Sequence, residues 1–296
     1  MDASDLRIFE AVARLGSMSL AGAELNTVQS NVTARVRALE DEIGSPLFQR
    51  HNRGVSLTAA GRRLLPYTAS VSRLLEDARR AAIDDGVPKG SLTVGSLETT
   101  AALRLSPILT EYASRYTDVD LVLRTGTSCE LVGQVLEHKL EGAFICGPVD
   151  HPELHEEAVF EEELVIVTSP QITSLENLLS RNDLKIIVLR TGCSYRQRLE
   201  SVLAARGIVG LRQLEFGTLE SIFNCVSAGL GLTLLPKSLI GSVWKHQRIA
   251  IHPIDPKDAF AETTFIRRRE AYVSSALEAF LNIARLKWPP IAEAAE

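Results

Sequence analysis

The sequence has few cysteines, and their spacing excludes common metal and disulfide frameworks. Only four occur in 296 residues: Cys129, Cys146, Cys193 and Cys225. They form no Cys-x-x-Cys pair and have no histidine partners at the spacing of a zinc site. We therefore expect reduced thiols and no bound metal.

Segments that would direct the chain into or across a membrane are also missing. The first residues, MDASDLRIFEAVARLG, mix charged and apolar side chains, whereas a secretory signal begins basic and continues apolar. The longest apolar runs are far too short to span a bilayer. These features predict a cytoplasmic protein that makes no membrane contact.

Signatures of the common enzyme classes are absent as well. The sequence contains no G-x-S-x-G, no P-loop, no G-x-G-x-x-G that opens a helix, and no H-E-x-x-H. His151 and His155 stand four residues apart, but Pro152 between them favours a surface loop over a metal-binding helix. We expect no enzymatic activity and no cofactor.

The net charge of −5 excludes a molecule that is basic throughout, so any contact with nucleic acid must depend on local charge. Between residues 29 and 63 there are six arginines and three acidic residues. Such a patch releases phosphate counterions even on an acidic protein. An ordinary solvated surface has a similar composition, so charge alone does not indicate DNA binding and the pattern of the residues must be considered.

Residues 16–61 carry the most informative pattern, which predicts a DNA-binding winged helix-turn-helix. A short helix is expected from Ser19, as its N-cap, to Leu25. After a turn, a second amphipathic helix follows and ends at Gly44. The apolar positions of this second helix are Val32, Val36, Leu39 and Ile43. Two short extended runs then meet at a hairpin tip, Arg53-Gly54.

Side chains at the start of the second helix are expected to contact base edges, and arginines farther along to contact phosphates. The expected base contacts are Gln29, Ser30, Asn31 and Thr33. The expected phosphate contacts are Arg35, Arg37, Arg50 and Arg53. Gln29 is the strongest candidate, since glutamine pairs bidentately with adenine. For Ser30 and Asn31, helix capping or solvation remains an alternative.

A long helix is predicted from about Ala59 to Asp84, with an apolar stripe at spacings of three and four residues. We call this set the linker-helix stripe: Leu64, Tyr67, Val71, Leu74, Ala78 and Ala81. The stripe favours dimerisation, because a two-fold DNA site suits a symmetric binder. The alternative is that it packs on its own domain. Residues 84–90 form the expected hinge.

From Ser91 onward, short β-rich runs alternate with helical patterns, which predicts an α/β fold with mainly parallel sheets. Its length favours two lobes. Ligands of such sheets bind at the carboxyl ends of the strands. Four segments follow predicted strands: 96–100, 125–128, 147–149 and 191–196.

These residues resemble the LysR-type transcriptional regulators over essentially the whole chain. The matching positions near the N-terminus are Phe9, Val12, Gly16-Ser17, Ala21, Leu25, Gln29-Ser30, Val32, Leu39-Glu40, Gly44, Leu47-Phe48, Arg50, Leu57-Thr58 and Ala60-Gly61. Residues 227–236, SAGLGLTLLP, look like the second-lobe signature of that family. The sequence departs from the family pattern at Val28, where Ser or Thr is usual, and at Ala34, where a basic residue is usual.

The resemblance implies an α/β protein with three parts: a winged helix-turn-helix domain (1–58), a linker and dimerisation helix (59–89), and an effector-binding domain (90–296). The last part would resemble a type 2 periplasmic binding protein, with lobe 1 at about 90–160 and 267–296 and lobe 2 at about 161–266. The implied partners are double-stranded promoter DNA, further copies of the chain in a dimer or dimer of dimers, RNA polymerase, and a small-molecule effector.

Taken singly, the polar residues after the strands fit ordinary helix caps. As a set, the resemblance favours an effector pocket for a small carboxylate or other anion. The candidate residues are Glu98, Thr99, Thr100, Thr127, Ser128, Gly147, Cys193, Ser194, Tyr195 and Arg196. Arg196 is expected to add positive charge to this site.

Two other functions fit parts of the sequence. A thiol-based redox sensor on the same scaffold would use Cys193, which lies at an expected helix N-terminus beside Arg196, where thiolate is favoured. Cys225 falls on an apolar helix and is expected in the core. A solute-binding protein for uptake would explain the two lobes, but it explains neither the missing signal nor the first ninety residues.

Overall fold

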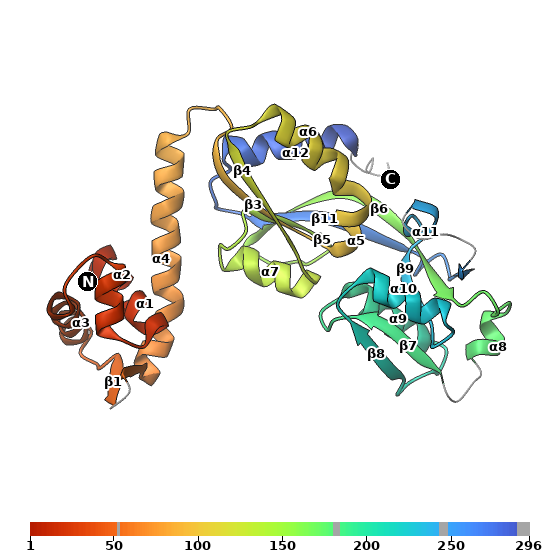
Figure 1. The fold of residues 1–296 in the computed structure, drawn as a ribbon, viewed down its shortest axis with the longest axis horizontal. Coiled ribbons are helices and arrows are strands. Elements are labelled where there is room, and N and C mark those ends of the chain that lie inside the picture. The colour runs from red at the N-terminus through yellow and green to blue at the C-terminus, as the bar shows by residue number, and fades with distance from the viewer. Residues whose placement is uncertain (52–53, 180–183, 243–247, 289–296) are drawn as a thin grey trace. The chain divides into compact units, whose positions relative to one another are not determined.

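The computed structural model describes residues 1–296 except 52–53, 180–183, 243–247 and 289–296 (Figure 1). The chain forms two compact units, Met1–Asp84 and Asp85–Glu296. Each unit has its own hydrophobic core. Within the described part of the chain, every helix is too short or too polar to cross a bilayer.

The first unit is a helical bundle with a small hairpin. Its elements are α1 (Ala3–Leu15), α2 (Met18–Glu24), α3 (Gln29–Ile43), β1 (Phe48–His51), β2 (Gly54–Leu57) and α4 (Ala59–Ile83). The strands β1 and β2 pair antiparallel. The apolar face of α3 packs against α1, and its positions Val32, Val36 and Leu39 are buried with Phe9 and Val12. This arrangement is a winged helix-turn-helix.

The N-cap of the short helix α2 lies two residues before the predicted one. Ser17, not Ser19, is the N-cap, and its hydroxyl accepts a hydrogen bond from the amide of Leu20 at 3.3 Å. The predicted cap was wrong because Gly16 ends α1 in the left-handed conformation. Ser17, the next residue, can therefore already act as the N-cap of α2.

The helix α4 is capped by Thr58, whose hydroxyl accepts from the amide of Gly61 at 3.0 Å. Its first turns pack on their own unit, where Leu64 and Leu65 join the core around α1. The side chains of Tyr67 and Leu74 are 71 % and 58 % exposed. Packing within the unit therefore accounts for Leu64, and Val71 is also half-buried, whereas Tyr67 and Leu74 of the linker-helix stripe are exposed.

The second unit is built on a mixed sheet of seven strands. They are β3 (Gly90–Ser96), β4 (Val119–Thr125), β5 (Gly142–Cys146), β6 (Leu154–Thr168), β9 (Thr233–Pro236), β10 (Ala250–Pro253) and β11 (Phe260–Arg268). The order is β10-β6-β11-β5-β3-β4, and β9 also pairs with β6. A separate parallel pair consists of β7 (Lys185–Leu189) and β8 (Arg212–Phe216).

The expectation of mainly parallel sheets is wrong for the centre of this unit. β3 runs parallel to β4 and β5, but β6 and β11 are antiparallel to each other and to their remaining neighbours. The reason is the length of β6, whose 15 residues pair first with β11 and then with β9 and β10. One long strand thus continues from the first part of the unit into the second.

Helices cover both faces of the sheet (Figure 1). They are α5 (Glu98–Thr100), a π-helical turn η1 (Ala101–Leu105), α6 (Ser106–Arg115), α7 (Ser128–Leu136), α8 (Leu175–Leu179), α9 (Ser194–Ala204), α10 (Leu219–Ser227), α11 (Leu239–Ser242) and α12 (Ser275–Lys287). The C-terminal helix α12 returns to α6, where the Tyr112 hydroxyl donates to the carbonyl of Ala276 at 2.8 Å. The turns that follow β3, β4 and β7 hold the polar segments singled out above.

Candidate DNA surface and ligand pocket

The start of α3 presents a polar face. Gln29, Ser30 and Asn31 are exposed and Thr33 is half-buried. The Gln29 side-chain amide donates to the Thr33 hydroxyl at 3.2 Å, and the Asn31 amide donates to the Thr27 hydroxyl at 2.9 Å. The N-cap residue, Val28, makes no side-chain hydrogen bond. This face therefore offers hydrogen-bonding groups held in place by their neighbours, which is the requirement for contact with base edges.

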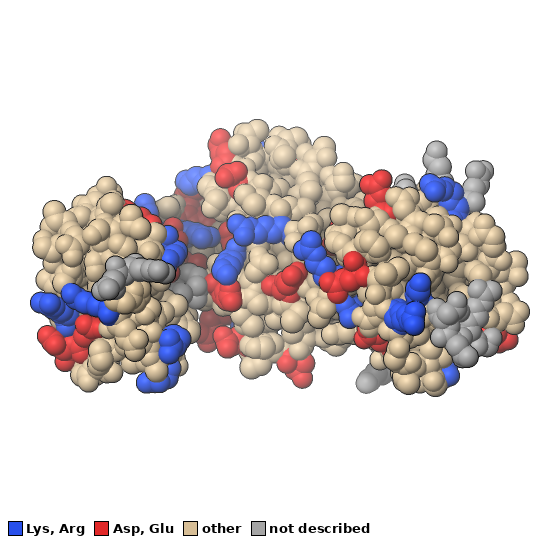
Figure 2. All heavy atoms as spheres, turned by 60° about the horizontal axis from the view of Figure 1, so that its bottom comes forward, with Lys and Arg blue, Asp and Glu red and all other residues tan. Residues whose placement is uncertain are grey.

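The arginines expected to contact phosphate differ in their surroundings. Arg35 is bound within the unit, at 3.0 Å from Asp2 and 2.6 Å from Asp5, and it joins α3 to the start of α1. Arg37 and Arg50 are exposed, and neither has a partner among the described residues. Arg53 lies outside the described residues. Figure 2 shows acidic and basic side chains interspersed on the displayed face, so no single sign dominates there.

A pocket of about 170 Å³ lies where β3, β4, β5 and β7 end. Seven of the residues predicted for the effector site line it: Glu98, Thr99, Thr127, Ser128, Cys193, Ser194 and Tyr195. For the residues that follow β3 and β4 the convergence follows from the topology, because the carboxyl ends of parallel strands meet at one edge of a sheet. The residues after β7 come from the separate β7–β8 pair, which packs against this edge. Thr125, Glu130, Leu189 and Arg190 also line the pocket.

Two segments that are far apart in the sequence meet at this pocket. The Ser194 hydroxyl donates to the Ser128 hydroxyl at 3.0 Å, and the Ser128 hydroxyl also accepts from the amide of Cys146 at 3.2 Å. Gly192 has a φ of 94°, and a Cβ atom there would lie only 2.9 Å from the Thr127 hydroxyl. Glycine therefore allows the turn after β7 to approach the start of α7.

The Thr99 hydroxyl is the unusual polar group of the pocket. The Thr99 side chain is 2 % exposed, and its hydroxyl makes no hydrogen bond of normal geometry among the described residues. The Tyr195 phenol lies close enough for Thr99 to lower the pKa of that phenol slightly, against the larger effect of burial. Buried hydroxyl groups are nearly always hydrogen-bonded in folded proteins. Thr99 also lines the pocket. Its hydroxyl is thus placed to bind a group that enters from the pocket.

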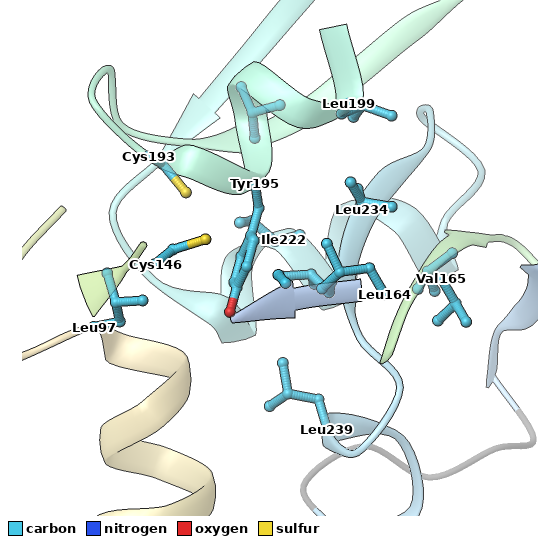
Figure 3. Packing of buried hydrophobic residues seen from close by; sticks show 14 of the residues in the cluster. Leu97, Cys146, Leu164, Val165, Cys193, Tyr195, Leu199, Ile222, Leu234 and Leu239 are labelled. Carbon is cyan, nitrogen blue, oxygen red and sulfur yellow. The ribbon is translucent and has the colours of Figure 1, made fainter. Parts of the chain in front are cut away.

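Apolar groups form the rest of the lining. Tyr195 is buried, the thiol groups of Cys193 and Cys146 lie together on one side of it, and Leu97 lies near Cys146 (Figure 3). Burial raises the pKa of the Tyr195 phenol, so this side chain is neutral at physiological pH. The pocket therefore combines a few polar groups with an apolar wall, as small-molecule sites do.

Three predicted effector residues do not line the pocket. Thr100 is buried in α5, and Gly147 lies against Thr264. Arg196 binds Glu200 at 3.1 Å and Glu215 at 2.8 Å, so its charge is used within the fold. The expectation that Arg196 adds charge to the site is wrong. The cation on the lining is Arg190, which directly precedes the segment 191–196 and was missed for that reason.

The expectation of a thiolate at Cys193 is also wrong. Cys193 is the N-cap residue of α9 and is buried. Burial raises its pKa, and this effect exceeds the opposing hydrogen bonds from the amides of Arg196 and Tyr195. Burial likewise raises the pKa of Cys146. Both thiols are protonated at neutral pH, which is unfavourable for a thiol-based sensor.

A winged helix-turn-helix followed by an α/β unit with a ligand-sized pocket defines a ligand-responsive, DNA-binding regulator. Comparison with protein families gives the same class. Residues 3–62 match the bacterial regulatory helix-turn-helix protein, lysR family, and residues 85–288 match the LysR substrate binding domain. The chain belongs to the LysR family of DNA-binding transcriptional regulators.

Relatives and solved structures agree with this assignment. The chain is 43 % identical to the HTH-type transcriptional regulator GltR of Bacillus subtilis (strain 168), over 95 % of both chains. It is 40 % identical to the HTH-type transcriptional regulator CzcR of Bacillus anthracis, over 95 % of this chain and 96 % of that one.

The fold is similar to that of full-length CbnR complexed with its target DNA, with a TM-score of 0.64, 22 % identity, and coverage of 97 % of this chain and 100 % of that one. It is also similar to a full-length OxyR variant from Pseudomonas aeruginosa, with a TM-score of 0.68, 18 % identity, and coverage of 100 % and 99 %. These likenesses concern the fold.

Proposed function

We propose that this regulator binds a two-fold promoter site as a dimer or a dimer of dimers, with α3 in the major groove and the β1–β2 hairpin along the phosphates. Gln29, Ser30, Asn31 and Thr33 contact bases, and Arg37, Arg50 and Arg53 contact phosphates. Arg35 instead stabilises the domain through Asp2 and Asp5. The chain acts in the cytoplasm, where promoter DNA and RNA polymerase are available to it. The observation that carries the proposal is the exposed polar face at the start of α3.

The second half of the proposal concerns control. A small carboxylate-bearing effector binds the pocket lined by Thr99, Ser128 and Arg190 and changes how the protein engages DNA. The support is the buried Thr99 hydroxyl, which makes no hydrogen bond of normal geometry among the residues that the structure describes, together with the contact between Ser128 and Ser194. A ligand that binds there would contact both segments, so its binding energy would depend on how they are arranged.

DNA binding is tested with Gln29→Ala. We expect it to weaken binding to the specific duplex by about 1–3 kcal/mol and to leave binding to a scrambled duplex nearly unchanged. The measurement is fluorescence anisotropy with DNA from the region upstream of the gene and with its scrambled version, at one fixed salt concentration. Equal loss on both duplexes would mean that Gln29 positions the protein and does not read sequence.

Asp41→Ala serves as the control, because Asp41 is exposed toward the far end of α3. Removing its negative charge should change affinity for both duplexes alike and leave their ratio as it was. If the wild-type protein binds neither duplex even in low salt, the DNA-binding function is wrong.

A further inference from the structure

Two opposite charges on the pocket lining have no partner within the part of the chain that the structure describes. Arg190 directly follows β7, and Glu98 is the first residue of α5. Among the described residues, neither side chain takes part in an ion pair or hydrogen bond. The third charged residue on the lining, Glu130, is already engaged, because its Oε2 accepts from the amide of Thr127 at 2.9 Å in a capping box. Counting only the described residues, the pocket thus offers one cation and one anion without a partner.

The guanidinium group of Arg190, an exposed residue, lies beside Gly217. A Cβ atom on Gly217 would lie 2.7 Å from Nη2 of Arg190 and 3.2 Å from its Nε. The guanidinium group therefore lies against the backbone of Gly217, which also lines the pocket. A guanidinium group on the lining is suited to a carboxylate, which it binds through paired hydrogen bonds.

Glu98 precedes Thr99, whose buried hydroxyl also lines the pocket. That hydroxyl lies near the Tyr195 phenol but makes no hydrogen bond of normal geometry within the described part of the chain. Glu98 itself is half-buried. A carboxylate and a hydroxyl at neighbouring positions accept hydrogen bonds from the same kind of donor, and an ammonium group supplies three of them.

These charges discriminate between classes of ligand. A simple carboxylate would satisfy Arg190 but leave Glu98 unpaired, and a dicarboxylate would bring a second negative charge toward it. An amine without a carboxylate would leave Arg190 unpaired. The volume of about 170 Å³ is below the roughly 300–1,000 Å³ of sites for drug-sized ligands.

We propose that the effector is a small zwitterion of the α-amino acid class, with its carboxylate at Arg190 and its ammonium group at Glu98 and Thr99. This inference rests on the proposed effector function and specifies its ligand. The apolar wall around Tyr195 and Leu97 then receives the side chain of the ligand, which the volume limits to a small one.

The test uses the full-length protein and measures thermal shift first, then calorimetric affinity. The probes are the standard L-amino acids, and for each one that binds, the matching carboxylate without the amino group and the matching amine without the carboxylate. We expect at least one amino acid to raise the melting temperature. Each matched analogue should bind at least about tenfold more weakly, because it leaves one charge of the pocket unpaired.

Two variants separate the roles of the charges. Glu98→Gln should weaken amino acid binding about tenfold and leave binding of the matching carboxylate unchanged, whereas Arg190→Gln should weaken both. The matched controls are Glu220→Gln and Arg212→Gln, two exposed positions outside the pocket lining, which should change neither affinity. Circular dichroism and the ligand-free melting temperature verify that every variant is folded.

The outcomes distinguish the two proposals. If carboxylates bind as tightly as amino acids, or if Glu98→Gln leaves amino acid affinity unchanged, the zwitterion is wrong while the effector function stands. If none of the three probe classes shifts the melting temperature, the zwitterion is overturned. If in addition Thr99→Val leaves promoter binding in cell extract unchanged, the effector function is overturned with it.

Discussion

Burial controls the ionisation of His252, a residue of β10 whose Nε2 lies 2.8 Å from the hydroxyl of Thr168. Burial lowers its pKa below the ordinary histidine value of 6.5. As the pH falls below that value, the unfolded chain takes up a proton that the folded chain does not. The unfolded state therefore binds more protons, and the stabilisation present above this pH is lost toward the lower pKa of the folded state.

Because the unfolded state binds more protons, the stability of the second unit should decrease as the pH falls. The melting temperature of that unit should fall between pH 7.5 and 5.5, and His252→Gln should make the fall shallower, whatever its effect at pH 7.5. Differential scanning calorimetry of both proteins over this range measures the two slopes. Equal slopes would show that His252 does not contribute to the acid sensitivity.

At single residues, the sequence predicted which positions carry polar side chains better than it predicted which of those side chains face the pocket. The hydroxyl residues after the strands were found because the turns after parallel strands carry helix caps. We predicted Arg196 and not Arg190 for the pocket, because the position of α9 decides which of the two arginines lines it. Arg196 lies on the first turn of α9 and reaches Glu215 on β8. That strand is not recognisable in the sequence.

The elements that escaped prediction are those whose partners lie far away in the sequence. β8 reads RQLEF and is largely exposed, so it lacks the apolar run that marks a strand. It exists because it pairs with β7 in parallel register. The first half of β6 is rich in glutamate and is a strand because β11 lies beside it. The helices of the first unit were easier, since local spacing and caps define them.

The helix α4 yields a prediction at this scale. Leu74 belongs to the linker-helix stripe and is largely exposed, so we expect a second copy of the chain to cover it. Leu74→Lys should shift the protein from dimer or tetramer toward monomer, because it places a charge in an apolar interface. Sedimentation velocity over a range of concentrations measures the change.

The control for this variant is Glu76→Lys, which introduces the same side chain at an exposed position on another face of α4. It should leave the oligomeric state as in the wild type. If Leu74→Lys sediments like the wild type at every concentration, the stripe is not the interface.

At the scale of the whole molecule, the two units have separate cores. The first is centred on Phe9, Val36 and Leu39, and the second surrounds the sheet. Because each unit buries its own apolar residues, each should unfold in its own transition. The chain should then show two melting temperatures, one for each unit. A substitution that destabilises one unit should lower only the melting temperature of that unit.

Gly61 tests this independence. A Cβ atom at this position in α4 would overlap the carbonyl oxygen of Leu47 and lie 2.8 Å from Cδ2 of Leu57. We expect Gly61→Ala to destabilise the first unit by about 1–3 kcal/mol through overpacking, and to lower the melting temperature of that unit by roughly 4–8 °C per kcal/mol.

Gly44→Ala is the comparison, because a Cβ atom there meets nothing within 4 Å and only its φ of 74° opposes the change. Calorimetry of the full chain should show a larger shift for Gly61→Ala than for Gly44→Ala, and an unmoved second transition in both. A single transition that moves as a whole would show that the two cores unfold together.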